Sequence, residues 1–499
     1  MRFAWILSMS VGFLSLSQEI LWVRYAGFAY HAVPQAFSFV LAMYLLGIAA
    51  GAAAGKWVCS RFPALLPAAG IVLVSAGTID MLGPLAYLHL KDSAMPLLIL
   101  ALLIFLCSGL KGVVFPIAHH LGSVPVSGQV AKSVSRVYFF NILGSTLGPL
   151  ITGFVLLDML TLQQVMLAMG WLTVWLGICC LMLGSRRIGA LAGVAVSIGL
   201  VSLFGLSDQI AGTLAEHGDG AVVQRVIQNK SGILHVLGAR TGGDIVFGGN
   251  VYDGRTNIDP RVNSNMIHRA LVLTVLKPDA QRVLVIGLST GAWTRLLSGF
   301  PNVTNIDVVE INPGYLQLIE DYPHISPVLR DPRVHVHIDD GRRWLKRNPD
   351  ARYDLVVMNT TFHWRTYSTN LLSTEFLQLV KRHMNPGAVI EYNATGSADV
   401  LRTAETVFPH VFRYVNSVIA SDHDFRPLLH EGDSALLKVR LDGRPLFDVT
   451  NPADRAFIRK TLSEPFVTVA EDRMRLNRDL EVITDWNMIT EYKYGKSFP

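Results

Sequence analysis

The feature that most constrains this chain is a division of charge and hydropathy near residue 206. Before it, ten Lys/Arg and four Asp/Glu are spread among long apolar runs; after it, 33 Lys/Arg and 34 Asp/Glu give an ordinary soluble composition. Seven runs approach the roughly 20 apolar residues that a helix needs to cross a bilayer. They lie at 3–22, 36–55, 64–88, 96–117, 137–157, 161–184 and 188–206. The sequence therefore predicts a multi-pass α-helical membrane domain at 1–206, embedded in lipid.

Positive charges in the loops between these runs predict an orientation. The N-terminus and the loops after the second, fourth and sixth runs carry seven, Arg2, Lys56, Arg61, Lys132, Arg136, Arg186 and Arg187, against Arg24 and Lys91 in the opposite loops. This pattern favours an inner-membrane protein whose soluble part lies outside, although a change of one helix would invert the answer. The net charge of +5 is loop charge of the membrane part, so no nucleic-acid partner is expected.

Three charged residues, Glu19, Asp80 and Lys111, lie within the apolar runs. A charge in hydrocarbon is costly, so such groups either pair with one another or face a wet path for a substrate. Gly47, Gly51 and Gly55 share one helical stripe, which is typical of close helix packing. The four cysteines show no metal-ligand spacing, and no metal site is expected.

The soluble part begins with a small β-strand domain, expected over 207–262. Its residues 221–254 predict a β-meander, because "VVQRVIQ", "GILHVLG" and "GDIVFGG" are short β-rich runs separated by turn residues. A helix is expected from about Ser264 to Leu276.

The next segment carries the strongest pattern in the chain. "RVLVIGLSTGAW" at 282–293 is an apolar strand that ends in a Gly-rich turn, where Gly287 and Gly291 let a ligand approach the backbone. The following strand ends in Glu310, which suits ribose hydroxyls. The third strand ends in Asp339 and Asp340, a place suited to an adenine amino group. Together these features indicate a nucleoside pocket on an α/β sheet.

These motifs resemble the membrane-fused branch of the spermidine synthase (aminopropyltransferase) family. The resemblance rests on "RVLVIGLSTG", "VVEINP", "DPRVHVHIDDGRRWL", "YDLVV" and "STEFLQLVKRHMNPGAV", and on "GLKGVVFP" in the membrane part. It implies a Rossmann-like, methyltransferase-type domain, here at 263–440, followed by a C-terminal extension at 441–499. It also implies a homodimer and a small-molecule donor, decarboxylated S-adenosylmethionine or S-adenosylmethionine.

The resemblance assigns roles to individual residues. Gly287, Ser289 and Gly291 would line the ligand, Glu310 would bind ribose, and Asp340 would hold the adenine amine. Two positions depart from the family pattern: Thr290 replaces an Asp of the first loop, and Asn359 replaces the catalytic Asp after the fourth strand. Asn can orient an amine, but it cannot take its proton.

The loop after Asn359 offers substitutes for the missing carboxylate. His363 titrates near neutrality and could act as a base, Trp364 and Tyr367 could hold a cation or a flat ring, and Arg365 suits an anion. A cation and a base at this place would favour an acidic or phosphorylated acceptor over a polyamine.

Three functions remain open at the level of sequence. The first is a membrane-anchored transferase with a nucleoside thioether donor. The second is a non-catalytic nucleoside-binding sensor or scaffold, which the two lost carboxylates favour. The third is a transport-linked protein whose membrane helices move the ligand that the soluble part recognises.

Overall fold

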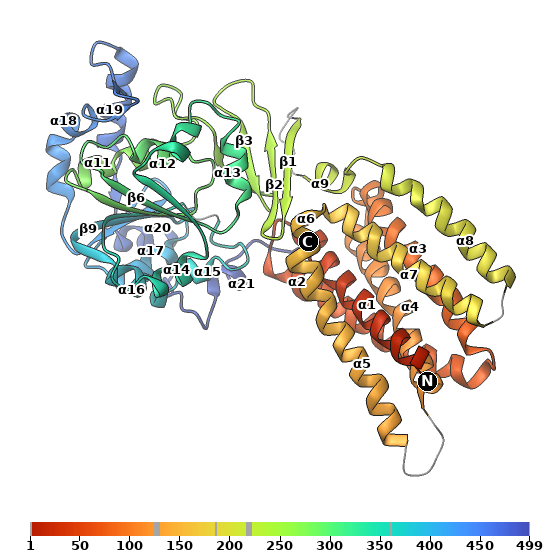
Figure 1. The fold of residues 1–499 in the computed structure, drawn as a ribbon. Coiled ribbons are helices and arrows are strands. Elements are labelled where there is room, and N and C mark those ends of the chain that lie inside the picture. Colours follow the sequence, from red (N-terminus) through yellow and green to blue (C-terminus); the bar gives the residue numbers. More distant parts are fainter. Residues whose placement is uncertain (1, 124–129, 185–186, 216–221, 360–361, 499) are drawn as a thin grey trace.

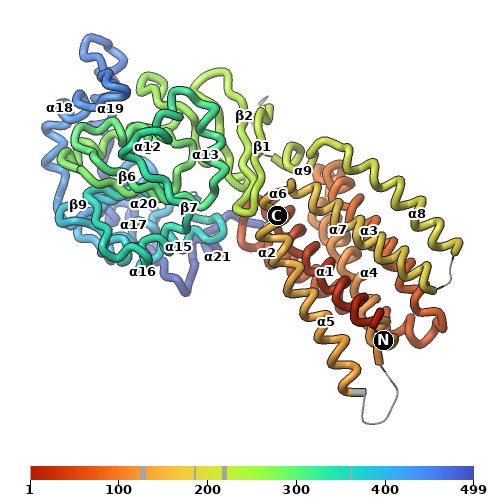
Figure 2. Tube along the Cα trace, in the orientation of Figure 1, coloured from red at the N-terminus to blue at the C-terminus, as the bar shows by residue number. Residues whose placement is uncertain are grey.

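The computed structural model describes residues 2–123, 130–184, 187–215, 222–359 and 362–498. A helical bundle and an α/β unit lie at opposite ends of the molecule, with a small β-sheet between them (Figure 1). The tube trace shows the C-terminus returning to this junction, close to α2 and α6 (Figure 2). Two residues used in the predictions lie outside the described residues: Arg186, one of the loop charges, and Ala221, the first residue of the predicted β-meander.

The helices of the first part follow the apolar runs. They are α1 (Arg2–Ala29), α2 (Pro34–Arg61), α3 (Leu65–Leu90), α4 (Pro96–Gly122), α5 (Val130–Ile151), the π-helical turn η1 (Thr152–Leu156), α6 (Leu157–Met159), α7 (Leu162–Leu183) and α8 (Arg187–Val201). Within the described residues, seven helical segments are long and apolar enough to cross a membrane, with α5, η1 and α6 forming one of them. The predicted helical architecture of this part is confirmed.

Glycine stripes bring the helices of the bundle together. A Cβ at Gly51 would collide with the carbonyl of Gly109 on α4, and one at Gly144 would collide with the carbonyl of Met9 on α1. Such small residues let helix backbones approach within van der Waals contact, which stabilises helix pairs where no hydrophobic driving force exists.

The bundle contains a buried ion pair. Lys111 Nζ donates to Asp80 Oδ1 at 2.8 Å and lies 2.6 Å from Oδ2, and both side chains are almost fully buried. Glu19 is half-buried. Two of the three charges in the apolar runs therefore neutralise each other, as the packing alternative required.

A four-stranded antiparallel sheet connects the two parts. Its strands are β1 (Val223–Asn229), β2 (Gly232–Leu237), β3 (Ile245–Gly248) and β4 (Val251–Arg255), in that order, after the short helix α9 (Gln209–Leu214). Asn250 donates to the carbonyls of Phe28 and Leu214, each at 3.0 Å, and Ile233 joins the hydrophobic core of the bundle. The meander is thus packed on the helix ends instead of lying free.

The α/β unit is built on an eight-stranded sheet of order β14-β10-β11-β9-β8-β5-β6-β7. Its strands are β5 (Arg282–Ile286), β6 (Asn305–Glu310), β7 (Val334–Ile338), β8 (Tyr353–Met358), β9 (Met384–Asn393), β10 (His410–Tyr414), β11 (Ser417–Ser421) and β14 (Phe466–Val467). Five neighbouring strands are parallel, in the order β9, β8, β5, β6 and β7. The remaining three strands, β11, β10 and β14, extend the sheet beyond β9 with antiparallel pairs. This is the predicted Rossmann-like, methyltransferase-type arrangement.

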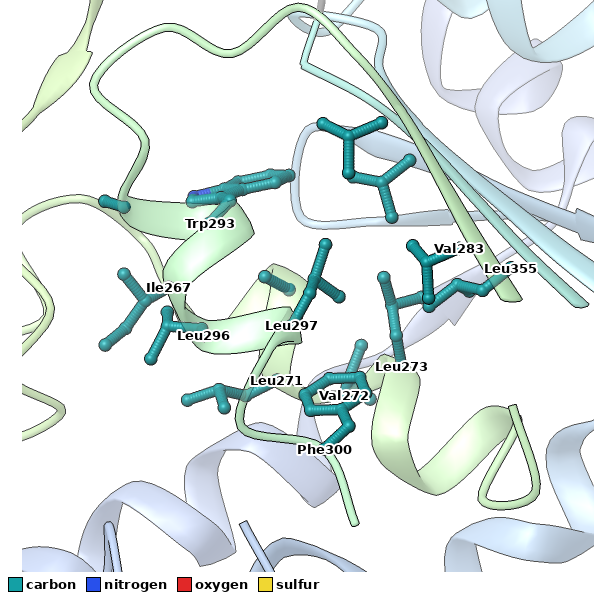
Figure 3. Packing of buried hydrophobic residues seen from close by; sticks show 14 of the residues in the cluster. Ile267, Leu271, Val272, Leu273, Val283, Trp293, Leu296, Leu297, Phe300 and Leu355 are labelled. Carbon is teal, nitrogen blue, oxygen red and sulfur yellow. The ribbon is translucent and has the colours of Figure 1, made fainter. Parts of the chain in front are cut away.

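Helices cover both faces of this sheet, so alternate residues of each strand enter two separate cores. Beside the first face lie α10 (His268–Leu271), α11 (Leu273–Leu276), α12 (Ala292–Leu297) and α13 (Gly314–Ile319); the second is covered by α14 (Gly341–Arg347), α15 (Thr369–Leu372), α16 (Thr374–Arg382) and α17 (Ala398–Glu405). Figure 3 shows Leu297 of α12 on the side of Leu273 and Val283, whereas Leu296 lies beside Ile267, all within one core. The helix expected at 264–276 is divided into α10 and α11.

The segment after residue 440 adds a strand to the main sheet. The predicted boundary falls inside β12 (Arg440–Leu441), which pairs with β13 (Arg444–Pro445). Beyond α18 (Gly432–Leu436) and α19 (Pro452–Ser463), β14 pairs with β10 in the main sheet, and α20 (Val469–Leu476) packs beside it. A two-residue strand has no detectable alternation, so the sequence carried no sign of this pairing.

The buried pair gives a test of the bundle. We expect Lys111→Met to lower the free energy of unfolding in detergent by about 3–5 kcal/mol, because it leaves the Asp80 carboxylate buried without its partner. The double variant Asp80→Asn/Lys111→Met should recover most of this loss, and Lys56→Met, at an exposed position, should change little. Equal losses in the single and double variants would contradict the pairing.

Candidate functional site

The polar residues predicted for the nucleoside pocket meet at one edge of the sheet. β5, β6, β7 and β8 are parallel, so their carboxyl ends lie side by side. A cavity of about 190 Å³ opens there and is lined by Gly287, Ser289, Glu310, Asp339, Asp340, Asn359 and Arg365, together with residues of β2, β3 and α13. The structure thus brings seven of the eleven predicted site residues to one cavity.

The Gly-rich turn closes one wall of this cavity. Gly287 has a φ of +88°, and a Cβ there would lie 2.8 Å from the carbonyl oxygen of Asn359. Ser289 also has a positive φ, +50°, and its hydroxyl donates to the carbonyl of Asp253 at 2.6 Å. Gly291, with a φ of +74°, caps α12, and its missing Cβ faces Ile319 and Ile325. Gly291 therefore shapes the turn from behind instead of touching the cavity.

Glu310 is buried, and each of its carboxylate oxygens is held by the backbone. Leu288 N–H donates to one oxygen at 2.7 Å, and Asn312 N–H donates to the other at 2.8 Å. Burial raises the pKa of Glu310 to about 7, although these backbone hydrogen bonds oppose the shift. A carboxylate oxygen has two lone pairs, so Glu310 keeps acceptor capacity for ribose hydroxyls.

Asp339 and Asp340 line the same cavity from the end of β7. Asp340 caps α14 by accepting from Arg343 N–H at 2.8 Å. Burial acts to raise the pKa of Asp339, but its ion pairs with Arg343 and Arg347 hold it below the ordinary value. Both carboxylates have structural partners, so only part of their acceptor capacity faces the cavity.

A second cavity of about 310 Å³ adjoins the first. The two share Asp253, Ser289 and Asn359, and the second also contains Tyr252, Gly254, Asn265, Met266, Arg269, Thr290, Trp293, Phe362, Asn393, Thr395, Gly396 and Asn416. Thr290, predicted to bind the donor, lies in this second cavity. Asn359 follows β8 at the boundary, where two ligands would meet.

Asp253, on β4, lies at that boundary, although its place in the predicted β-meander indicated no functional role. Tyr315 donates its hydroxyl to Asp253 Oδ2. Burial raises the pKa of Asp253, while the Tyr315 hydrogen bond and the charge of Arg365 act in the opposite direction. A carboxylate thus faces both cavities despite the amide at position 359.

The side chains of the loop after Asn359 lie in different surroundings and do not meet at one point. His363 Nδ1 shares a hydrogen bond of 2.7 Å with the hydroxyl of Thr395, a residue that lines the second cavity. Burial lowers the pKa of His363, so its imidazole is neutral near pH 7. Trp364 stacks on Phe362, and Lys496 of the same chain lies 5.2 Å from its ring centre. Tyr367 is 72% exposed and lines a third cavity beside α1 and α2.

Arg365 has a different position from its neighbours. Its half-buried guanidinium lies beside Gly248 and Gly249, where it borders both the first cavity and the third one. Arg365 is thus separated from His363 and from the cavity that Thr395 lines.

The segment "TDWNMITEY" at 484–492 holds this loop in place. Buried Glu491 accepts from the backbone N–H groups of Tyr367, at 3.1 Å, and Thr369, at 2.9 Å. Asp485 forms a bidentate ion pair with Arg342 at 2.7 and 2.8 Å. The ending "TDWNMITEY" thus fixes the loop backbone from more than a hundred residues away.

Sequence reasoning missed Asp253, Arg269 and Glu391. Arg269 directly precedes the apolar run 270–273, and Glu391 interrupts the apolar run in the second half of β9. A charge in the middle of a buried element is the signal that could have identified both. Among the described residues, no group of three His, Cys, Asp or Glu could hold a metal ion.

The carboxyl of Glu310 gives a pH test. Its folded pKa of about 7 exceeds the ordinary value of 4.5, so its stabilising contribution is complete below pH 4.5 and is lost as the pH rises through 7. The stability of Glu310→Gln relative to the wild-type protein should therefore rise between pH 5 and 8, by at most about 1.4 kcal/mol per pH unit. Thermal unfolding at several pH values measures it, and a pH-independent difference would contradict the burial of an ionisable group.

Comparisons with known proteins agree with this geometry. Residues 261–419 match the family model described as "Spermine/spermidine synthase domain". A polyamine aminopropyltransferase of Mycobacterium tuberculosis is 24% identical over 487 residues, covering 92% of this chain and 90% of that protein. Polyamine aminopropyltransferase 2 of Streptomyces coelicolor is 31% identical over 146 residues, covering 28% of this chain and 26% of that protein.

Among solved structures, a spermidine synthase from Thermotoga maritima aligns with a TM-score of 0.40 at 14% identity, over 51% of this chain and 87% of that chain. The chain therefore carries a spermine/spermidine synthase domain in its C-terminal part, behind seven long apolar helices.

Proposed function

We propose that this protein is a membrane-anchored transferase that moves an alkyl group, of the aminopropyl type, from an S-adenosyl-type donor to an acceptor. The single observation that carries the proposal is the shared boundary of two cavities at Asp253, Ser289 and Asn359. A transfer reaction needs two ligands whose reacting atoms meet, and an effective site holds them in that geometry.

The first cavity suits the donor. Glu310 can accept from ribose hydroxyls, and Asp340 lies at the end of β7, where an adenine amine would find an acceptor. The donor would be decarboxylated S-adenosylmethionine or S-adenosylmethionine. The names of the M. tuberculosis and S. coelicolor relatives support an aminopropyl donor.

Asp253 supplies the carboxylate that Asn359 lacks. In the reaction an amine attacks the carbon next to the donor's sulfonium; a C–N bond forms, the C–S bond breaks, and sulfur keeps the electron pair as a neutral thioether. The amine must lose a proton, and a carboxyl group with a raised pKa is a better base than an ordinary one. Asn359 would orient the amine through its amide oxygen.

Seven apolar helices would anchor this enzyme in the bilayer, and we propose a dimer of two such chains. A nucleoside-binding scaffold is the second candidate, because Thr290 and Asn359 stand where the family pattern has carboxylates. Binding of a nucleoside without any transfer to an amine would favour it. The transport-linked alternative would need an open path through the bundle, where Asp80 and Lys111 are instead paired and buried.

Donor binding is tested by calorimetry with methylthioadenosine, S-adenosylmethionine and its decarboxylated form. We expect Glu310→Ala to weaken the binding of the nucleosides at least about tenfold, because a hydrogen bond to a charged group contributes about 1.5–3 kcal/mol. Glu310→Gln is a second variant for the case that the Ala variant does not fold, and exposed Glu320→Ala is the matched control. The absence of binding to the wild-type protein would defeat the proposal.

The role of Asp253 is tested by turnover. Asp253→Asn should lower kcat by about 10²–10⁴-fold, the contribution of a positioned general base, while methylthioadenosine still binds. Asp279→Asn, at a side chain that is 74% exposed, should leave kcat unchanged. A variant of Asp253 with full activity would assign the proton transfer to another group.

A further inference from the structure

The second cavity contains a buried cation that has no carboxylate in contact. Arg269 is 7% exposed and lies on α10, facing this cavity. Its guanidinium Nη1 donates to Asn416 Oδ1 at 2.8 Å and to Ser417 Oγ at 3.4 Å, and Nε donates to the carbonyl of Met266. All three acceptors are neutral oxygens.

Three other buried or half-buried arginines of the described chain have ionic partners. Arg295 pairs with Asp442, Arg413 with Asp472 and Arg478 with Asp399, each at 2.5–2.7 Å. Buried arginines are rarely found unpaired, because removing a charge from water is expensive unless an opposite charge compensates it. Within the described chain, Arg269 forms no ion pair shorter than 4 Å, so its charge is compensated only in part.

Glu391 is the carboxyl group that attracts Arg269 most strongly. It forms no ion pair with Arg269, and among the described residues neither of its carboxylate oxygens has a hydrogen-bond partner. Burial raises the pKa of Glu391 to about 7, so a substantial fraction of this carboxyl is neutral near pH 7. The positive charge of the guanidinium is therefore not fully balanced, and an anion could bind it from the side that faces the cavity.

Trp293 fixes the orientation of this cation. The guanidinium carbon of Arg269 lies 4.7 Å from the centre of the Trp293 ring, and both residues line the cavity. Because Nε and Nη1 already donate to Met266, Asn416 and Ser417, Nη2 is the nitrogen that remains to donate to an anion.

We propose that the second cavity binds an acceptor of the amino acid type, with its carboxylate on Arg269 and its amine at Asp253 and Asn359. The inference rests on the proposed function and names the acceptor class for it. The charged groups of the cavity support this polarity, because Asp253 at the boundary suits an amine and Arg269 suits an anion. A diamine would instead bring its second ammonium against a buried guanidinium.

The transfer keeps the balance of atoms and charge described above. The amine nitrogen of the amino acid bonds to the donor carbon, the C–S bond breaks, and the proton passes to Asp253. The acceptor's carboxylate stays unchanged on Arg269 throughout. The product is an N-alkylated amino acid, together with a neutral thioether nucleoside.

The experiment compares matched acceptors with the full-length protein in detergent and decarboxylated S-adenosylmethionine as donor. Unbranched ω-amino acids of three to six carbons are paired with diamines of the same chain length, and release of methylthioadenosine is measured. We expect at least one amino acid to exceed its diamine in kcat/KM by about tenfold or more, the effect of one charge-assisted contact. Diamines preferred at every length would overturn the inference.

Arg269→Met separates the acceptor from the donor. We expect it to remove the preference for the carboxylate while methylthioadenosine binding stays at the wild-type level, which also shows that the variant is folded. If the variant does not fold, competition in the wild-type protein between each amino acid and the monoamine lacking the carboxylate takes its place, and equal inhibition overturns the inference. If methylthioadenosine does not bind the wild-type protein at all, the proposed function fails and this inference fails with it.

Discussion

The parallel pairing of β5 with β6 and β8 is the constraint on which the site depends. Because neighbouring parallel strands end at the same edge, Gly287, Glu310 and Asn359 are brought together although the first and the last of them lie more than seventy residues apart in the chain. The pairing continues past the strand ends: Gly287 N–H donates to Val309 at 2.9 Å, and Asn359 N–H donates to Ile286 at 3.0 Å. These hydrogen bonds bring the Asn359 backbone so close to Gly287 that no side chain fits there. The shape of both cavities follows from this contact.

The helical bundle makes direct contacts with the segments that form the site. Thr366, in the loop after β8, donates through its N–H to the carbonyl of Ala32 at 2.9 Å, just before α2 begins. Asn250 ties the meander to α1, and the third cavity shares Ser231, Gly249 and Arg365 with the first. The loop that borders the first cavity therefore rests on helix ends from the other half of the chain. Its second support, Glu491, comes from the C-terminal segment, so two distant segments fix one loop.

The charges around the two cavities are unevenly distributed. Carboxylates surround the first: Glu310, Asp339 and Asp340, with Asp253 at the boundary. In the second, the described lining is dominated by amides and hydroxyls, with Arg269 as its cation. Burial raises the pKa of both Glu310 and Glu391 to about 7, which leaves these carboxyls poised between two charge states near neutrality. Such groups respond strongly to the charge of a bound ligand, because their desolvation is already complete.

The sequence by itself determined the elements whose signal is local. Apolar length predicted the seven helices, and the strand, Gly turn and terminal acid predicted β5, β6 and Glu310, because these patterns depend on neighbours within about twenty residues. Only the tertiary structure decided what the loop after β8 contacts. His363 and Tyr367 stand in the same few residues as Arg365, yet the first is held by Thr395, the second is exposed, and the third alone borders the first cavity. The second cavity could not be predicted from the sequence, since Asp253, Arg269 and Thr290 come from three segments that only the packed sheet and its helices bring together. The physical reason is that a side chain's direction in a loop is set by long-range partners, which no local pattern encodes.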